Sequence, residues 1–174
     1  MRRLLLLRHA KATPSAGRSD YERALVERGR RDAARVGAFL AEAGMIPDLA
    51  IFSGALRTRE TAAIVLKAWP QRIEARAEPS LYDATRASVQ AIVRALPDTA
   101  ASVLLIGHNP GLADLANHLV GGGAERDIAR MAGKFPTAGL AALEFAVQRW
   151  RDVAPGSARL ARFVTPDDLS VPRV

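Results

Sequence analysis

Three short apolar runs stand out along the chain, and each is bounded by charged or small polar residues. They lie at residues 4–7, 49–52 and 102–106. A continuous apolar run of this length is typical of a strand that is buried on both faces. Fainter strand patterns lie at residues 73–79, 140–147 and 160–164. We therefore expect a sheet whose central strands come from the first three runs.

Between these runs, apolar residues recur with a helical spacing. The longest such segment is 20–43, and Gly44 stands where a helix stop belongs. Its apolar residues fall near one stripe, with arginines and glutamates opposite. They are Leu25, Ala33, Val36, Leu40 and Ala43. The pattern predicts a helix over this whole segment.

Further helices are expected at residues 56–69, 88–96 and 110–120. For the last of them, Asn109 is the expected N-cap and Pro110 occupies the first helical position, which proline favours. The helix is expected to stop at a loop formed by Gly121, Gly122 and Gly123. Strands that alternate with helices predict an α/β fold, an αβα sandwich on a largely parallel central sheet. The length of 174 residues suits a single domain over residues 1–174.

The chain contains no cysteine, which excludes disulfides, zinc–thiolate sites and thiol catalysis. Its apolar runs are too short for a signal-peptide core or a membrane span. We therefore expect a cytoplasmic protein with no membrane partner.

Basic residues outnumber acidic ones and give a net charge of +7, and 22 of the 25 basic residues are arginines. Arginine suits phosphate recognition, so a nucleic-acid interface has to be considered. The arginines are scattered, however, and aromatic residues make up only 5% of the chain. This distribution favours a solvated basic surface, and no nucleic-acid partner is expected.

Polar groups follow each of the three strongest strand patterns at once. Arg8 and His9 follow the first, Ser53 and Arg57 the second, and His108 the third. In open α/β sheets the ligand crevice lies beyond the carboxyl ends of the strands, so these side chains are expected to meet.

Two histidines and two arginines form a set that suits phosphoryl transfer. The transferred group carries negative charge on its equatorial oxygens and needs rigid donors and an in-line nucleophile. Arginine provides paired donors that stay charged. A neutral imidazole is a competent nucleophile near pH 7.

Three sequence blocks carry a resemblance to a known family. They are LRHAK around His9, SGALRTRETA around Arg57 and GHNPG around His108. Together they resemble the histidine phosphatase superfamily, with its phosphoglycerate mutase-like fold, and especially its SixA-like phosphohistidine phosphatase branch. The stretches KFPTAGLAALEF and FVTPDDL resemble the C-terminal pattern of that branch. One departure is Ala10, where most of the superfamily has glycine, although alanine is familiar in the SixA-like branch.

The resemblance implies a role for each of these residues. His9 would be the nucleophile that is transiently phosphorylated, and Arg8, Arg57 and His108 would bind the phosphoryl oxygens. Asp83, in the stretch Leu81-Tyr82-Asp83, resembles the acidic proton donor of the superfamily. An ordinary cap or loop role for Asp83 stays open, because Asp is common at helix starts.

Other positions allow two interpretations. Lys11, Asp20 and Arg23 would form the rim of the pocket or belong to the solvated surface. Ser53 and Thr61 would orient Arg57 or act as ordinary caps and helix-face residues.

The expected function is that of a metal-independent phosphatase that works through a phosphohistidine intermediate on His9 and has no cofactor. The preferred substrate is a phosphohistidine on a partner protein. The alternatives are small phosphomonoesters, such as a sugar phosphate or a nucleotide, and a non-catalytic phosphate-binding module. A metal site formed by His108, Asp114 and His118 matches no recognised ligand spacing, and His118 is interpreted as structural.

Overall fold

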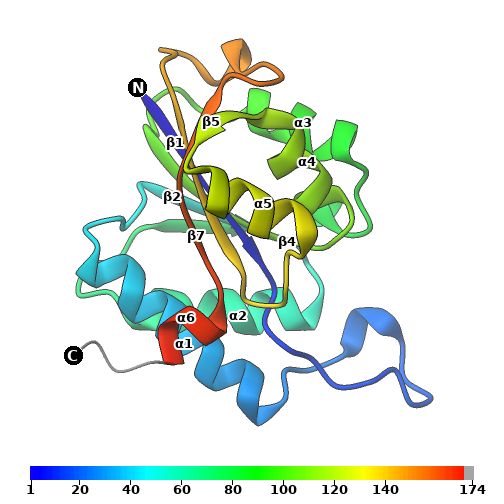
Figure 1. Cartoon of the computed structure of the whole chain (residues 1–174). Coiled ribbons are helices and arrows are strands. Elements are labelled where there is room, and N and C mark those ends of the chain that lie inside the picture. Colours follow the sequence, from blue (N-terminus) through cyan, green and yellow to red (C-terminus); the bar gives the residue numbers. More distant parts are fainter. Residues whose placement is uncertain (171–174) are drawn as a thin grey trace.

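A mixed β-sheet forms the centre of the computed structural model (Figure 1). The structure describes residues 1–170, and within them seven strands lie in the order β3-β2-β4-β1-β6-β7-β5. The strands are β1 Arg2–Arg8, β2 Leu49–Phe52, β3 Glu74–Ala77, β4 Ser102–Gly107, β5 Val120–Gly123, β6 Leu140–Phe145 and β7 Ala158–Val164. Strand β6 is antiparallel to both of its neighbours, and all other pairs are parallel. The prediction of a largely parallel sheet is confirmed.

Helices cover both faces of the sheet (Figure 1). One face packs against α1 Glu27–Glu42, α2 Leu56–Lys67 and α6 Pro166–Ser170. The other face packs against α3 Arg86–Arg94, α4 Gly111–Leu119 and α5 Glu125–Gly133. Short 3₁₀ turns lie at η1 Asp20–Glu22, η2 Pro79–Leu81 and η3 Trp150–Asp152. None of the helices in residues 1–170 combines the length and the hydropathy that a transmembrane span requires.

The four leucines of β1 link the two cores. Leu4 and Leu6 point into the core beneath α3, α4 and α5, while Leu5 and Leu7 point into the core beneath α1 and α2. All four side chains have no exposed surface. Burial on both faces holds β1 in place, because a shift by one residue would exchange the two sets.

The register of the sheet brings the ends of three strands into line. In the pairing of β1 with β4, Arg8 lies opposite Gly107, and the His9 N–H donates to the Gly107 carbonyl at 3.1 Å. In the pairing of β2 with β4, Phe52 lies opposite Ile106. Residues that follow β1, β2 and β4 therefore emerge at one edge of the fold.

The first helix begins later than its hydrophobic pattern predicts. Residues 20–22 form a 3₁₀ turn, and the helix starts at Glu27. The segment between them pairs with the chain that follows His9: Thr13 N–H donates to the Ala24 carbonyl at 2.8 Å, and Val26 N–H donates to the Lys11 carbonyl at 3.0 Å. These backbone hydrogen bonds replace those that a longer helix would have made.

The predicted glycine loop at residues 121–123 is wrong, because this segment belongs to strand β5 at the edge of the sheet. A Cβ on Gly121 would lie 1.9 Å from the Gly156 carbonyl oxygen, so glycine permits a close approach of two backbones. Helix α5 follows this strand and was not predicted.

The predicted cap of α4 is also wrong. Pro110 is the N-cap residue, and no side chain caps this helix. The Asn109 side chain instead donates through Nδ2 to the Phe135 carbonyl at 2.9 Å. Asn109 therefore ties the end of β4 to the segment between α5 and β6.

Gly29, in the first turn of α1, provides a test of how the chain after His9 is held. A Cβ at this position would lie 2.1 Å from the Lys11 carbonyl oxygen, whereas a Cβ on Gly133, at the end of α5, would meet nothing within 4 Å. We expect Gly29→Ala to lower the free energy of unfolding by about 1–3 kcal/mol through overpacking. Gly133→Ala should leave it unchanged or raise it by up to about 1 kcal/mol. Urea unfolding measures both; a Gly29→Ala variant as stable as the wild type would refute the close contact.

Candidate active site

A polar cavity of about 270 Å³ lies beyond the carboxyl ends of β1, β2 and β4. Its lining side chains come from the ends of β1 and β4, the segment around η1, the first turn of α2 and the loop after η2. They are Arg8, His9, Asp20, Arg23, Arg57, Tyr82, Asp83, His108 and Asn109. The cavity thus brings together all five residues that we singled out for phosphoryl chemistry, namely Arg8, His9, Arg57, Asp83 and His108.

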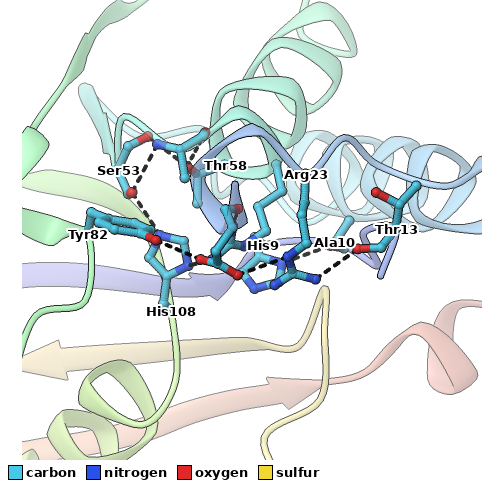
Figure 2. Close-up of polar contacts among 11 residues, drawn as sticks. His9, Ala10, Thr13, Arg23, Ser53, Thr58, Tyr82 and His108 are labelled. Atoms are coloured by element: carbon cyan, nitrogen blue, oxygen red, sulfur yellow. Dashed lines mark hydrogen bonds and ion pairs between the residues drawn. The ribbon is translucent and has the colours of Figure 1, made fainter. Parts of the chain in front are cut away.

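The rings of the two cavity histidines, His9 and His108, lie close together and are tilted by 53° to one another (Figure 2). The ring centroids of His9 and His108 are 5.2 Å apart. Arg57 Nη2 lies 3.2 Å from His108 Nδ1. Groups about a hundred positions apart in the sequence therefore meet as the strand-end pattern predicts.

The hydrogen bonds of His9 identify which ring nitrogen carries the lone pair. Its Nδ1 lies 2.8 Å from its neighbour's carbonyl oxygen, that of Ala10. A carbonyl oxygen only accepts, so Nδ1 carries the proton and Nε2 is left unprotonated. The Ala10 N–H donates in turn to Thr61 Oγ1 at 3.0 Å, which fixes the backbone beside the ring.

The surroundings of His9 keep its ring neutral. Burial lowers the pKa of His9 to about 3, and the nearby His108, Arg57 and Arg8 act in the same direction. The hydrogen bond to the Ala10 carbonyl raises the pKa of His9, but by less than burial lowers it. A histidine with such a pKa keeps the lone pair on Nε2 throughout the neutral pH range.

His108 is also neutral, but its proton is on Nε2 and its lone pair is on Nδ1. Arg57 Nη2 can only donate, so His108 Nδ1 accepts, and His108 Nε2 donates to Ser53 Oγ at 2.7 Å. Burial, followed by the charge of Arg57, lowers the pKa of His108 to about 4. Ser53 therefore contacts His108 and not Arg57, whose orientation was one of the two roles that the sequence left open for Ser53.

Thr61 fits the other role that the sequence left open, that of an ordinary helix-face residue. Its hydroxyl donates to the Arg57 backbone carbonyl at 2.6 Å and accepts from the Ala10 N–H. It therefore joins α2 to the loop that carries His9 and does not touch the guanidinium of Arg57.

Two of the three arginines that line the cavity, Arg8 and Arg57, donate hydrogen bonds to backbone carbonyls. Arg8 Nη1 donates to the Phe135 carbonyl at 3.0 Å, and Arg57 Nη1 donates to the Asp20 carbonyl at 2.7 Å. The Nε atoms of both arginines are buried without a hydrogen-bond partner among residues 1–170. Guanidinium groups beside the cavity are suited to an anionic group, because arginine provides paired donors that stay charged.

Asp20 and Arg23 lie at the rim of the cavity, one of the two roles that the sequence left open for them. Asp20 accepts hydrogen bonds from Arg23 Nε at 2.9 Å, Arg57 Nη2 at 3.0 Å and the Tyr82 hydroxyl at 2.7 Å. The hydrogen bond from Tyr82, together with the charge of Arg57, lowers the pKa of Asp20 to about 2. The carboxylate therefore stays ionised and partly offsets the positive charge of Arg57.

Tyr82 is the contributor that sequence reasoning missed. Its ring lies edge-on to that of His108, with centroids 5.5 Å apart, and the Arg57 guanidinium carbon lies 5.9 Å from its centre. Its hydroxyl also holds Asp20 (Figure 2). The only sequence signal was its place between Leu81 and Asp83, in the stretch singled out for the acid.

The loop after η2 also presents Asp83 to the cavity. Its backbone has a positive φ of 52°, a conformation that Asp tolerates better than most residues. Lys11, by contrast, does not line this cavity and lies on the neighbouring one.

A metal-binding cluster is not part of this site. Within the described residues, no three His, Asp or Glu side chains are placed to hold a metal ion, and His108, Asp114 and His118 are no exception. The positive charge of the cavity comes from its arginines. An unprotonated imidazole nitrogen among guanidinium groups is an arrangement suited to phosphoryl transfer.

Comparisons with known proteins agree with this geometry. Residues 4–85 match the profile of the histidine phosphatase superfamily (branch 1). The uncharacterised protein Rv1276c of Mycobacterium tuberculosis is 35% identical over 92% of this chain and 99% of its own length. A SixA protein of Agrobacterium tumefaciens, described as a candidate phosphohistidine phosphatase, is 30% identical. Its crystal structure covers 95% of this chain and 98% of its own, with a TM-score of 0.80.

A more distant likeness shows how widely the fold is shared. The mycobacterial glucosyl-3-phosphoglycerate phosphatase Rv2419c is 18% identical, with a TM-score of 0.62 over 94% of this chain and 97% of its own. At this identity the likeness concerns the fold alone. The family profile and the relatives that match along almost the whole chain are decisive: this protein belongs to the histidine phosphatase superfamily, is a phosphatase of that type and is similar to SixA.

Proposed function

We propose that this protein hydrolyses phosphohistidine on a partner protein, without a metal, through a covalent intermediate on His9. The observation that carries the proposal is the unprotonated Nε2 of His9, held in a cavity between Arg8 and Arg57. The 30% identical SixA protein, described as a candidate phosphohistidine phosphatase, supports the choice of substrate.

The reaction would proceed in two displacements at phosphorus. In the first, His9 Nε2 forms a bond to phosphorus while the bond from phosphorus to the substrate nitrogen breaks. In the second, a water molecule attacks phosphorus, inorganic phosphate leaves, and the lone pair returns to His9. Arg8 and Arg57 would stabilise the charge on the equatorial oxygens in both steps.

The nature of the leaving group favours phosphohistidine. Once the second ring nitrogen of a phosphohistidine is protonated, the ring departs as neutral imidazole and needs no acid at the breaking bond. An alkoxide, which departs from a phosphomonoester, needs a proton in the transition state. The ionised Asp20 is unsuited to supply it, because its pKa is lowered to about 2.

Asp83 is the observation that favours the second candidate, a small phosphomonoester. It lines the cavity, and within residues 1–170 its carboxylate makes neither a hydrogen bond nor an ion pair. No other side chain engages this carboxyl group, so it is available to serve as the acid toward a departing alkoxide in the proposed reaction. We assign Asp83 this role for phosphomonoester substrates only.

The first test removes the nucleophile. We expect His9→Ala to lower the rate on an aryl phosphate and on a phosphohistidine peptide by a factor of about 10³ or more, with EDTA present throughout. His118→Ala, which alters the histidine outside the cavity, should keep the wild-type rate. Trapping the phosphorylated enzyme should place an acid-labile label on Nε2 of His9. Undiminished turnover by His9→Ala would overturn the proposal.

The second test is the pH profile of kcat/KM. The pKa values of His9 and His108 are lowered to about 3 and about 4, so both rings stay neutral well below the usual pKa of histidine. After correction for the ionisation of the substrate, we expect kcat/KM to stay level down to about pH 5 and to fall only as the rings gain protons below that. An enzyme pKa near 6.5 in this profile would contradict the neutral pair.

The third test separates the two substrate classes. We expect Asp83→Asn to lower kcat on a phosphomonoester with an alkyl leaving group by about 10²-fold or more, because the amide has no proton to give. Turnover of a phosphohistidine peptide should change less than about threefold. Equal losses on both substrates would show that Asp83 acts in some way other than as a leaving-group acid.

A further inference from the structure

A second cavity adjoins the one that holds His9. It has a volume of about 300 Å³ and shares Arg8 with the first. Its walls are the segment after β1, the first turns of α1, the segment between α5 and β6, and the start of α6, which lies beside α1 (Figure 1).

Positive charge predominates on these walls. Four cationic side chains line the cavity, namely Arg8, Lys11, Arg28 and Lys134, against the carboxylates of Asp32 and Asp167. The negative charge of Asp32 is already paired with two arginines, because its buried carboxylate lies 3.7 Å from Arg28 and 3.3 Å from Arg35. The wall therefore carries a surplus of positive charge.

Besides Arg8, which belongs to both cavities, two lysines carry positive charge on this wall without an acidic partner among residues 1–170. Lys11 and Lys134 are exposed, and neither makes an ion pair with any residue among 1–170. They are two of the only three lysines in the chain, which otherwise uses arginine for positive charge. A lysine ammonium on a flexible stem acts as an adaptable point charge for an anionic partner.

A third cavity extends the second one further. It has a volume of about 340 Å³ and shares Lys134, Pro136, Thr165 and Asp167 with the second cavity. We call the second and third cavities together the basic groove. The groove starts at Arg8, which also lines the cavity that holds His9, and runs along the segment between α5 and β6.

We propose that the basic groove binds acidic side chains that flank the phosphorylated residue of the partner protein. This inference rests on the proposed function and names the sequence feature that would make one phosphohistidine a better substrate than another. A succession of adjoining hollows suits an extended polypeptide, which advances about 3.3 Å per residue, better than one small molecule. With the phosphohistidine at His9, acidic residues a few positions away would reach Lys11 first and Lys134 beyond it.

The test uses the full-length wild type, the double variant Lys11→Ala/Lys134→Ala and the control Lys67→Ala. Lys67 is exposed at the end of α2 and lines none of the three cavities. The substrates are two phosphohistidine peptides of equal length, one flanked by Asp and Glu and the other by Asn and Gln. An aryl phosphate reports the chemistry without any flanking residue.

We expect the wild type to prefer the acidic peptide by about tenfold in kcat/KM at low ionic strength, mostly through KM. The double variant should lose most of this preference and keep its rate on the aryl phosphate, while Lys67→Ala behaves like the wild type. Because the lysines are exposed, the preference should shrink as salt is raised from about 0.05 to 0.5 M.

Three results would overturn the inference: no preference in the wild type, an unchanged preference in the double variant, or an equal loss on the aryl phosphate. Failure of the proposed function gives a different pattern. In that case the wild type hydrolyses the aryl phosphate but neither peptide, and the groove loses its assigned role together with the substrate.

Discussion

The structure depends on the burial of β1 on both faces, between two cores that each take alternate leucines of one run. This constraint sets the register of β1 against β4 and therefore the position of Arg8 and His9 relative to His108. A nucleophile has to approach phosphorus along a defined line, and a strand that cannot slide is a rigid support for it. The hydrophobic core and the chemistry of the site thus rest on the same four side chains.

The positive charges around the cavity help to keep its two imidazole rings unprotonated. The guanidinium groups that would hold a phosphoryl group also lower the pKa of both histidines, although burial is the larger cause. The Nε atoms of Arg8 and Arg57 lie beside this cavity, buried without a hydrogen-bond partner among residues 1–170. At the rim, the Asp20 carboxylate accepts a hydrogen bond from Arg57 Nη2 and offsets part of the positive charge of that guanidinium group.

Sequence reasoning succeeded where one physical rule dominates. Buried parallel strands have a plain apolar signature, and the crevice rule places the residues after them in one cavity, so the sheet and the grouping of His9, Arg57 and His108 could be predicted. It failed where backbone pairing between distant segments decides the outcome. The late start of the first helix at Glu27 and the strand at Gly121 both depend on partners that no local spacing reveals. Tyr82 was missed because its role depends on Asp20, a residue 62 positions away.

The Phe135 carbonyl accepts hydrogen bonds from both Arg8 and Asn109, so one peptide group of the C-terminal half braces the ends of β1 and β4. That peptide and His108 both lie outside residues 4–85, the stretch that the superfamily profile covers. An N-terminal fragment limited to that stretch would retain His9 and Arg57 yet lack His108, Asn109 and the Phe135 carbonyl. The cavity is thus a joint product of both halves of the polypeptide, and neither half alone contains all the side chains that line it.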